Sequence, residues 1–174
     1  MIIQEDYKRF VNELKLKLKS NNKKIVFVCI GTNKIIGDSL GALIGSNLNK
    51  LLINNKEIDV IGNFENPIHA LNIEENIKYI NNKYKDKCIV VIDSAISKKE
   101  LVGKIFVTEG KMKLNKGKNK EKLELGDISI KYSVCEDLED TNKNLQSLKH
   151  IPIQLIVDLS NIISLGIYEA ITQY

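Results

Sequence analysis

The sequence predicts an α/β domain in which helices cover both faces of a largely parallel sheet. Two runs of consecutive apolar residues, 24–30 (KIVFVCI) and 88–92 (CIVVI), are typical of strands that are buried on both faces. Segments with apolar residues at helical spacing alternate with such runs, which is the pattern of a layered α/β architecture. The chain has 174 residues, of which 43% are apolar, so we expect one sizeable core and a single domain over 1–174.

Helical and strand-like segments alternate along the first half of the chain. Charged residues separate apolar ones at helical spacing in the first segment, so residues 1–22 are expected to contain an N-terminal amphipathic helix packed on the domain. A glycine-containing loop separates the first strand from the next helix, and the three together are half of a βαβ unit. In chain order, the expected elements are a helix at 4–20, a strand at 24–30, a helix at 39–53, a strand at 58–61, a helix at 73–84 and a strand at 88–92.

A lysine-rich segment, residues 109–127, interrupts the second half of the chain. We interpret it as a mobile surface loop because it is too polar to pack. Its lysines could hold an acidic partner, but a lysine run without interleaved aromatic residues is more often a solvated surface. These lysines are Lys111, Lys113, Lys116, Lys118, Lys120 and Lys122. The other expected elements are strands at 103–108 and 128–134, a short helix at 141–148, an interrupted strand at 151–157 with Pro152 near its start, and a closing helix at 158–171.

Composition narrows the class of protein. The 26 basic residues exceed the 22 acidic ones only mildly, and Arg9 is the one arginine, so nucleic acid is not the expected partner. The 3 cysteines are odd in number and lack a C-x-x-C pair, which fits a reducing cytoplasm. No apolar stretch approaches the roughly 18 residues of a membrane span, and the N-terminus lacks the order of a signal peptide. We therefore expect a cytoplasmic protein with no membrane partner.

Polar residues follow three of the predicted strands. In open α/β sheets, ligands bind beyond the carboxyl ends of the strands, so these residues are the candidates for a functional site. The glycine loop after the first strand lacks the ending of a phosphate-binding P-loop and the spacing of a dinucleotide fingerprint, so no cofactor is expected. The candidates are Gly31, Thr32, Asn33 and Asp38 after the first strand, Asn63 and His69 after the second, and Asp93 and Ser94 after the third.

Asp38 and Asp93 are the acid/base candidates. Two carboxylates in a partly enclosed site do not both ionise easily, so one keeps a proton while the other can activate water. On spacing alone the simpler interpretation is favoured, in which Asp38 caps the following helix and Asp93 ends a strand. His69 with the two carboxylates could complete a three-ligand metal site, although by itself it is more often a loop histidine.

Four ordered motifs carry a family resemblance that spans roughly residues 24 to 170. They are CIGTNKIIGDSLG at 29–41, the segment 61–72 with its Ile-Gly-Asn and Pro-Ile-His-Ala-Leu-Asn, VIDSA at 91–95 and GDISI at 126–130. The chain resembles the YyaC-type sporulation protease family. That family is similar to the spore germination protease and, more distantly, to hydrogenase-maturation endopeptidases. The resemblance implies a peptidase-like domain with a three-layer α/β/α fold.

The resemblance also changes how the two aspartates are interpreted. Asp38 and Asp93 stand at the motif positions of two essential aspartates in the germination protease, which implies a catalytic pair. Hydrogenase-maturation enzymes gather an acidic residue, an aspartate and a histidine around nickel. The matching third segment here, 126–129, has no histidine, and His69 belongs to a different loop. We therefore expect no metal, with a weak alternative site at Asp38, Asp93 and His69.

The motifs and the resemblance leave two functions open. The first is an aspartate-dependent endopeptidase of sporulation or germination, located in the forespore or the mother cell, whose substrate is a spore protein or peptide. The second is a non-catalytic sporulation factor that binds a peptide or protein in the same crevice or along an exposed strand edge. A third polar group beside the aspartates would favour the enzyme, and His69 and Ser129 are the candidates. The sequence leaves the oligomeric state open.

Overall fold

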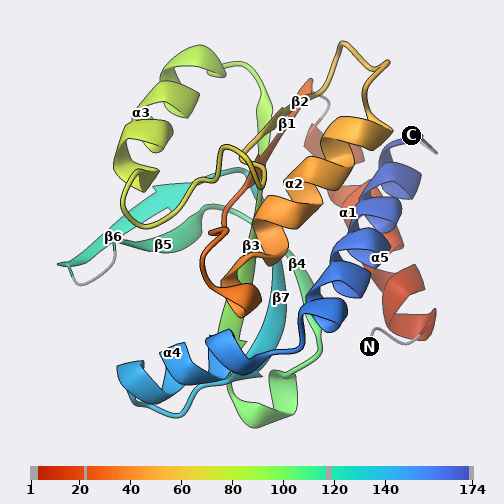
Figure 1. Ribbon diagram of the computed structural model, residues 1–174. Coiled ribbons are helices and arrows are strands. Elements are labelled where there is room, and N and C mark those ends of the chain that lie inside the picture. Colours follow the sequence, from red (N-terminus) through yellow and green to blue (C-terminus); the bar gives the residue numbers. More distant parts are fainter. Residues whose placement is uncertain (1–3, 22, 117–118, 173–174) are drawn as a thin grey trace.

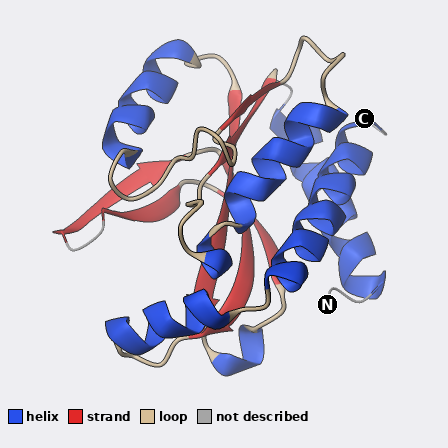
Figure 2. Ribbon diagram, viewed as in Figure 1, coloured by secondary structure: helices blue, strands red, loops and turns tan. Residues whose placement is uncertain are grey.

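The computed structural model describes residues 4–21, 23–116 and 119–172. Its centre is a five-stranded sheet in the order β2-β1-β3-β7-β4 (Figures 1 and 2). All neighbours pair in parallel except β4, which runs antiparallel to β7 at one edge. The strands of this sheet are β1 (Ile25–Cys29), β2 (Asp59–Ile61), β3 (Cys88–Ser97), β4 (Ile105–Glu109) and β7 (Ile128–Glu136).

Three helices cover one face of the sheet: α1 (Gln4–Asn21), α2 (Leu40–Leu51) and α5 (Ile153–Thr172). Alternate residues of the strands point toward them, so Phe27 of β1, Ile92 of β3 and Ile130 of β7 share one buried cluster with these helices. The burial of β1 on both faces agrees with the continuous apolar run that predicts it. The expected N-terminal amphipathic helix is confirmed as α1.

The other face carries α3 (Ile73–Lys83) and a two-stranded hairpin made of β5 (Met112–Lys116) and β6 (Asn119–Leu125). Val28 and Val91 of the sheet pack here with Ile77 of α3 and with Met112 and Leu125 of the hairpin. The two covered faces confirm the predicted fold, a mostly parallel sheet flanked by helices.

The hairpin corrects the interpretation of residues 109–127 as a loop too polar to pack. Met112 pairs with Leu125 and Leu114 with Leu123. Side chains alternate between the two faces of a strand, so these apolar residues share one side and reach the core, while Lys113 on the opposite side is exposed. The apolar residues of this segment therefore alternate with lysines and other polar residues, which is the pattern of a strand with one buried side. Residues 117 and 118, and the side chains of residues 115–122, lie outside the described part.

The last helix corrects a second expectation. No strand forms at 151–157; α5 begins at Ile153, directly after Pro152, and continues to Thr172. Proline is tolerated at a helix start, and the buried Ile156, Leu159 and Ile163 follow at helical spacing. The helix is long and apolar enough to cross a membrane by length and composition, contrary to the expectation from apolar runs. Of its apolar 18-residue window, 44% is buried inside the protein.

Two short helical turns and α4 complete the carboxyl end of the sheet. The first turn, η1 (Ile36–Asp38), precedes α2, and the second, η2 (Lys99–Leu101), follows β3. α4 (Thr141–His150) packs against η1 and β7. Its start is fixed by Asp140, whose side chain accepts hydrogen bonds from the backbone N–H groups of Asn142 and Lys143. These elements surround the edge of the sheet at which ligands are expected.

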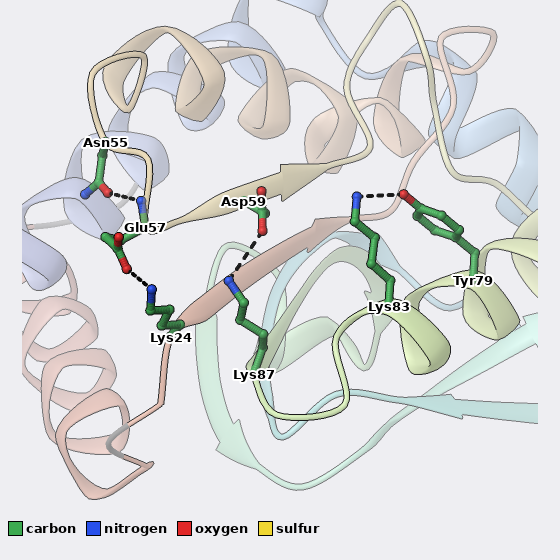
Figure 3. Close-up of polar contacts among 7 residues, drawn as sticks. All are labelled: Lys24, Asn55, Glu57, Asp59, Tyr79, Lys83 and Lys87. Carbon is green, nitrogen blue, oxygen red and sulfur yellow. Dashed lines mark hydrogen bonds and ion pairs between the residues drawn. The ribbon is translucent and has the colours of Figure 1, made fainter.

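The opposite, amino-terminal edge of the sheet is bound by exposed ion pairs (Figure 3). Lys24 pairs with Glu57, and Lys87 Nζ lies 3.6 Å from Asp59 Oδ2. Such exposed pairs contribute little to stability, about 0–1 kcal/mol each. These two ion pairs therefore contribute little to holding this end of the sheet together.

Candidate active site

A cavity of about 320 Å³ opens beyond the carboxyl end of β1, beside the second half of β3. It is lined by Asp38 from η1, His69 from the loop after β2 and Asp93 from β3. Lys131 of β7 and Lys113 of the hairpin complete its charged lining. The cavity therefore brings together three predicted site residues from three separate loops or strands.

Main-chain contacts place Asp38. The backbone N–H of Thr32 donates to the Asp38 carbonyl at 2.9 Å, and a Cβ on Gly31 would lie 2.5 Å from that oxygen. Only glycine fits this close approach. Asp38 is not the cap of α2, because Ser39 occupies that position and its hydroxyl donates to Ile36 instead. The simpler interpretation of Asp38 as a helix cap is wrong.

Asp93 lies within a strand and does not end one, which corrects the other half of the simpler interpretation. β1 pairs with β3 only as far as Ile92, but β7 continues alongside to Ser97. Asp93 therefore sits where β3 passes beyond β1 and opens to the cavity. Its partner in register on β7 is Lys131, on the same face of the sheet.

The pKa values of both aspartates are raised. Burial raises the pKa of Asp38 from its usual 3.8 to about 6, although a hydrogen bond with the Ser94 side chain acts against this rise. Burial also raises the pKa of Asp93 well above its usual range, and the charge of Asp38 raises it further. Lys131 and the Ser94 backbone N–H lower it in part. Asp38 therefore ionises first, and Asp93 keeps its proton at a higher pH.

His69 lines the cavity, and its own loop holds its ring. Its Nδ1 accepts from the backbone N–H of Leu71 at 3.3 Å, and its own backbone N–H donates to Asn72 Oδ1 at 2.8 Å. A neutral ring that accepts at Nδ1 carries its proton on Nε2. Among the residues that the structure describes, Nε2 has no hydrogen-bond partner.

The arrangement does not fit a bound nickel ion. Across residues 4–21, 23–116 and 119–172, no three His, Cys, Asp or Glu side chains are grouped as a metal ion would require. Asp38, Asp93 and His69 share the cavity without converging on one point. The weak alternative of a metal site at these residues is therefore not supported by their placement.

The remaining predicted residues hold the loops or lie nearby. Gly31 and Ser94 line the cavity. Asn33 Nδ2 donates to the Phe64 carbonyl at 3.2 Å, which ties the first loop to the second. Two others act within their own loops: Thr32 Oγ1 accepts from the Lys34 N–H, and Asn63 Oδ1 accepts from the Glu65 and Asn66 N–H groups. Ser129 Oγ of β7 donates to the Gly110 carbonyl in the turn after β4.

Two lysines in the cavity are absent from the predicted site. Lys131 lies inside β7 and so is not among the residues that follow a strand, and Lys113 lies in the segment interpreted as a loop. The available signal was a single charge in the strand-like run 128–134. A lone lysine in a central strand needs either solvent or a carboxylate partner.

Comparison with known proteins agrees with this fold and with the resemblance of the motifs. The chain is 28% identical over 151 residues to the uncharacterized protein YyaC of Bacillus subtilis (strain 168), covering 86% of this chain and 70% of YyaC. The crystal structure of a NiFe hydrogenase maturation protease, HycI from Thermococcus kodakarensis KOD1, superposes with a TM-score of 0.59 at 18% identity. That match covers 90% of this chain and 98% of HycI, and it establishes a shared fold. A family model matches residues 2–166, so the chain belongs to the DUF1256 family of proteins of unknown function.

Proposed function

We propose that this protein is an aspartate-dependent endopeptidase that acts on a spore protein during sporulation or germination, inside the forespore or the mother cell. The observation that carries the proposal is the presence of Asp38 and Asp93 in one cavity, with both pKa values raised. Such a pair supplies a base and an acid at one place, as peptide hydrolysis requires. The sporulation context rests on the resemblance of the motifs to the YyaC-type family.

The pair holds one proton between the pKa of Asp38 and that of Asp93. In that state Asp38 takes a proton from water while the water oxygen bonds to the carbonyl carbon of the peptide. Asp93 donates its proton to the carbonyl oxygen, which gives a neutral tetrahedral diol. The C–N bond then breaks as Asp38 passes its proton to the leaving nitrogen, and a diol hydroxyl returns a proton to Asp93. The pair regains its starting protonation.

Two neighbours support this chemistry. The free Nε2–H of His69 is available to orient a substrate carbonyl. Lys131 limits the rise in the Asp93 pKa, so that Asp93 can still release its proton in each cycle. Both are positioning residues in this proposal, since the proton transfers involve the aspartates alone.

The test is the cleavage of proteins extracted from dormant spores, followed by mass spectrometry of new N-termini. We expect the wild-type chain to generate a reproducible set of new N-termini. Asp38→Asn and Asp93→Asn should each lower the rate at least about a hundredfold, because asparagine keeps the shape but cannot carry the proton. Asp86→Asn is the matched control, an exposed aspartate in the turn after α3. Unchanged cleavage by both cavity variants would contradict the proposal.

One observation favours the alternative, a non-catalytic sporulation factor. The carboxyl groups of Asp38 and Asp93 both take part in hydrogen bonds with Ser94, as they would in a static binding site. Under this alternative, the wild-type chain produces no new N-termini but binds one component of the extract saturably. The same extract therefore distinguishes the two functions.

A further inference from the structure

A second cavity, of about 540 Å³, adjoins the first over the same face of the sheet. The two share Ala95, Ile96, Lys113 and Lys131 in their linings, so they are direct neighbours. Its volume lies within the roughly 300–1,000 Å³ of ligand pockets. We call this second cavity the β4 groove, defined by Ile96, Leu101, Phe106, Lys111, Met112 and Lys113.

The β4 groove has an apolar floor. Phe106 is 37% exposed, whereas its neighbours on β4, Ile105 and Val107, face the helix-covered side and are buried. Leu101 of η2 and Met112 of the hairpin border the same space. An aromatic side chain left exposed in a concave, largely apolar cavity is typical of a binding site.

The rim of the β4 groove is positively charged. Lys111, Lys113 and Lys131 line it, and its lining contains no aspartate or glutamate among the residues whose side chains are described. Within the part of the chain that the structure describes, neither Lys111 nor Lys113 forms an ion pair. Lys113 lies opposite Glu124 in the register of the hairpin, which offsets part of its charge. The lining of the groove still carries an excess of positive charge, and a complementary ligand is acidic.

We propose that the β4 groove binds a peptide segment in which a large apolar side chain is flanked by acidic residues. The apolar side chain occupies the space above Phe106, and the acidic groups lie against Lys111 and Lys113. A neighbouring peptide bond of the same segment then lies in the adjoining cavity, beside Asp38 and Asp93. This substrate class rests on the proposed peptidase function only for the last step, since binding to the groove does not require cleavage.

Binding is tested by fluorescence anisotropy with the full chain and three labelled synthetic peptides. The first has phenylalanine between glutamates, the second replaces the phenylalanine with alanine, and the third replaces the glutamates with lysines. We expect the first to bind at least about tenfold more tightly than either of the others. Equal affinities, or no binding of the first peptide at millimolar protein, would overturn the proposal.

Variants locate the site. The double substitution Lys111→Glu and Lys113→Glu should weaken binding of the first peptide about tenfold and reduce its salt dependence. Phe106→Ala should weaken it about fivefold, and Phe106→Leu less. The control is Lys8→Glu, at an exposed position of α1 on the other face of the sheet. It should change the affinity less than about twofold, because salt screens a charge at that distance. Thermal unfolding checks that each variant is folded.

The outcomes separate this proposal from the proposed function. Loss of peptide binding in the groove variants, with no cleavage by the wild-type chain, would support the groove and contradict the peptidase. Spore-protein cleavage by the wild-type chain, together with peptide binding that the groove variants leave unchanged, would support the peptidase and overturn the groove.

Discussion

The two faces of the sheet differ in how completely they are covered. Helices α1, α2 and α5 cover one face across its whole width, whereas α3 and the hairpin leave the other face open over β7 and β4. β7 belongs to both faces, because its side chains point alternately toward the helix-covered face and toward the open face. Those facing the helices are Ile128, Ile130 and Tyr132, and those facing the open side are Ser129, Lys131 and Ser133.

This difference indicates that the two sides of a single strand have different roles. The covered face buries large apolar side chains and supplies most of the hydrophobic stabilisation. The open face buries less apolar surface, and its charged side chains are accessible to a ligand. Stability and chemistry should then respond to different substitutions, even at adjacent positions of one strand.

The largest expected difference between the faces is seen with two phenylalanines. Phe27→Ala on the covered face should lower the free energy of unfolding by about 4 kcal/mol, since the side chain is completely buried. Phe106→Ala on the open face should cost about 1–2 kcal/mol, because that side chain is already 37% exposed. Urea unfolding measures both. Similar losses would show that the open face is as tightly packed as the covered one.

The pH dependence of stability should show an effect of intermediate size, and it concerns Asp38, which lines the cavity on the open side. Because the pKa of Asp38 rises from 3.8 to about 6 on folding, the folded state binds more protons over that range, and stability falls as pH rises through it. Asp38→Asn removes this dependence. Relative to the wild type, the variant should gain about 2 kcal/mol between pH 4 and pH 8.

The gain should appear in guanidinium unfolding at the two pH values, and Asp86→Asn serves again as the matched control. A variant whose stability relative to the wild type is the same at both would show that Asp38 titrates normally.

The smallest expected effect on stability belongs to Lys131. Lys131→Met removes the positive charge opposite Asp93, so the pKa of Asp93 should rise further. The free energy of unfolding should change by about 1 kcal/mol or less, since methionine keeps much of the side-chain length. Carboxyl-carbon NMR titration follows Asp93 directly, with Lys8→Met as the control. An unchanged or lowered Asp93 pKa would contradict the pairing across β3 and β7.

The sequence predicts the elements whose pattern is local. The apolar runs of β1 and the first half of β3, and the amphipathic spacing of α1, follow from burial alone. The start of α5 does not, because its β-branched residues after Pro152 also suit a strand, and packing against α1 and α2 selects the helix. The hairpin is missed because lysines mask the alternation of Met112 and Leu114.

The same distinction applies to the site. The sequence places Asp38, His69 and Asp93 near one another because each follows a strand predicted to be parallel. It cannot place Lys131, whose approach to Asp93 depends on the pairing of β7 with β3 and on their register. It also cannot show that β3 extends past β1, which is what exposes Asp93 to the cavity.

The strand order has a consequence for the newly made chain. β1, β3 and β7 are parallel neighbours joined by long connections, and such non-local pairings form late because loop closure must come first. Until β7 has left the ribosome and paired, Lys131 is not beside Asp93, and the β7 side of the cavity is missing. The order of synthesis therefore delays assembly of the acid/base pair until nearly all of the sheet exists, so a nascent or partly unfolded chain lacks the site.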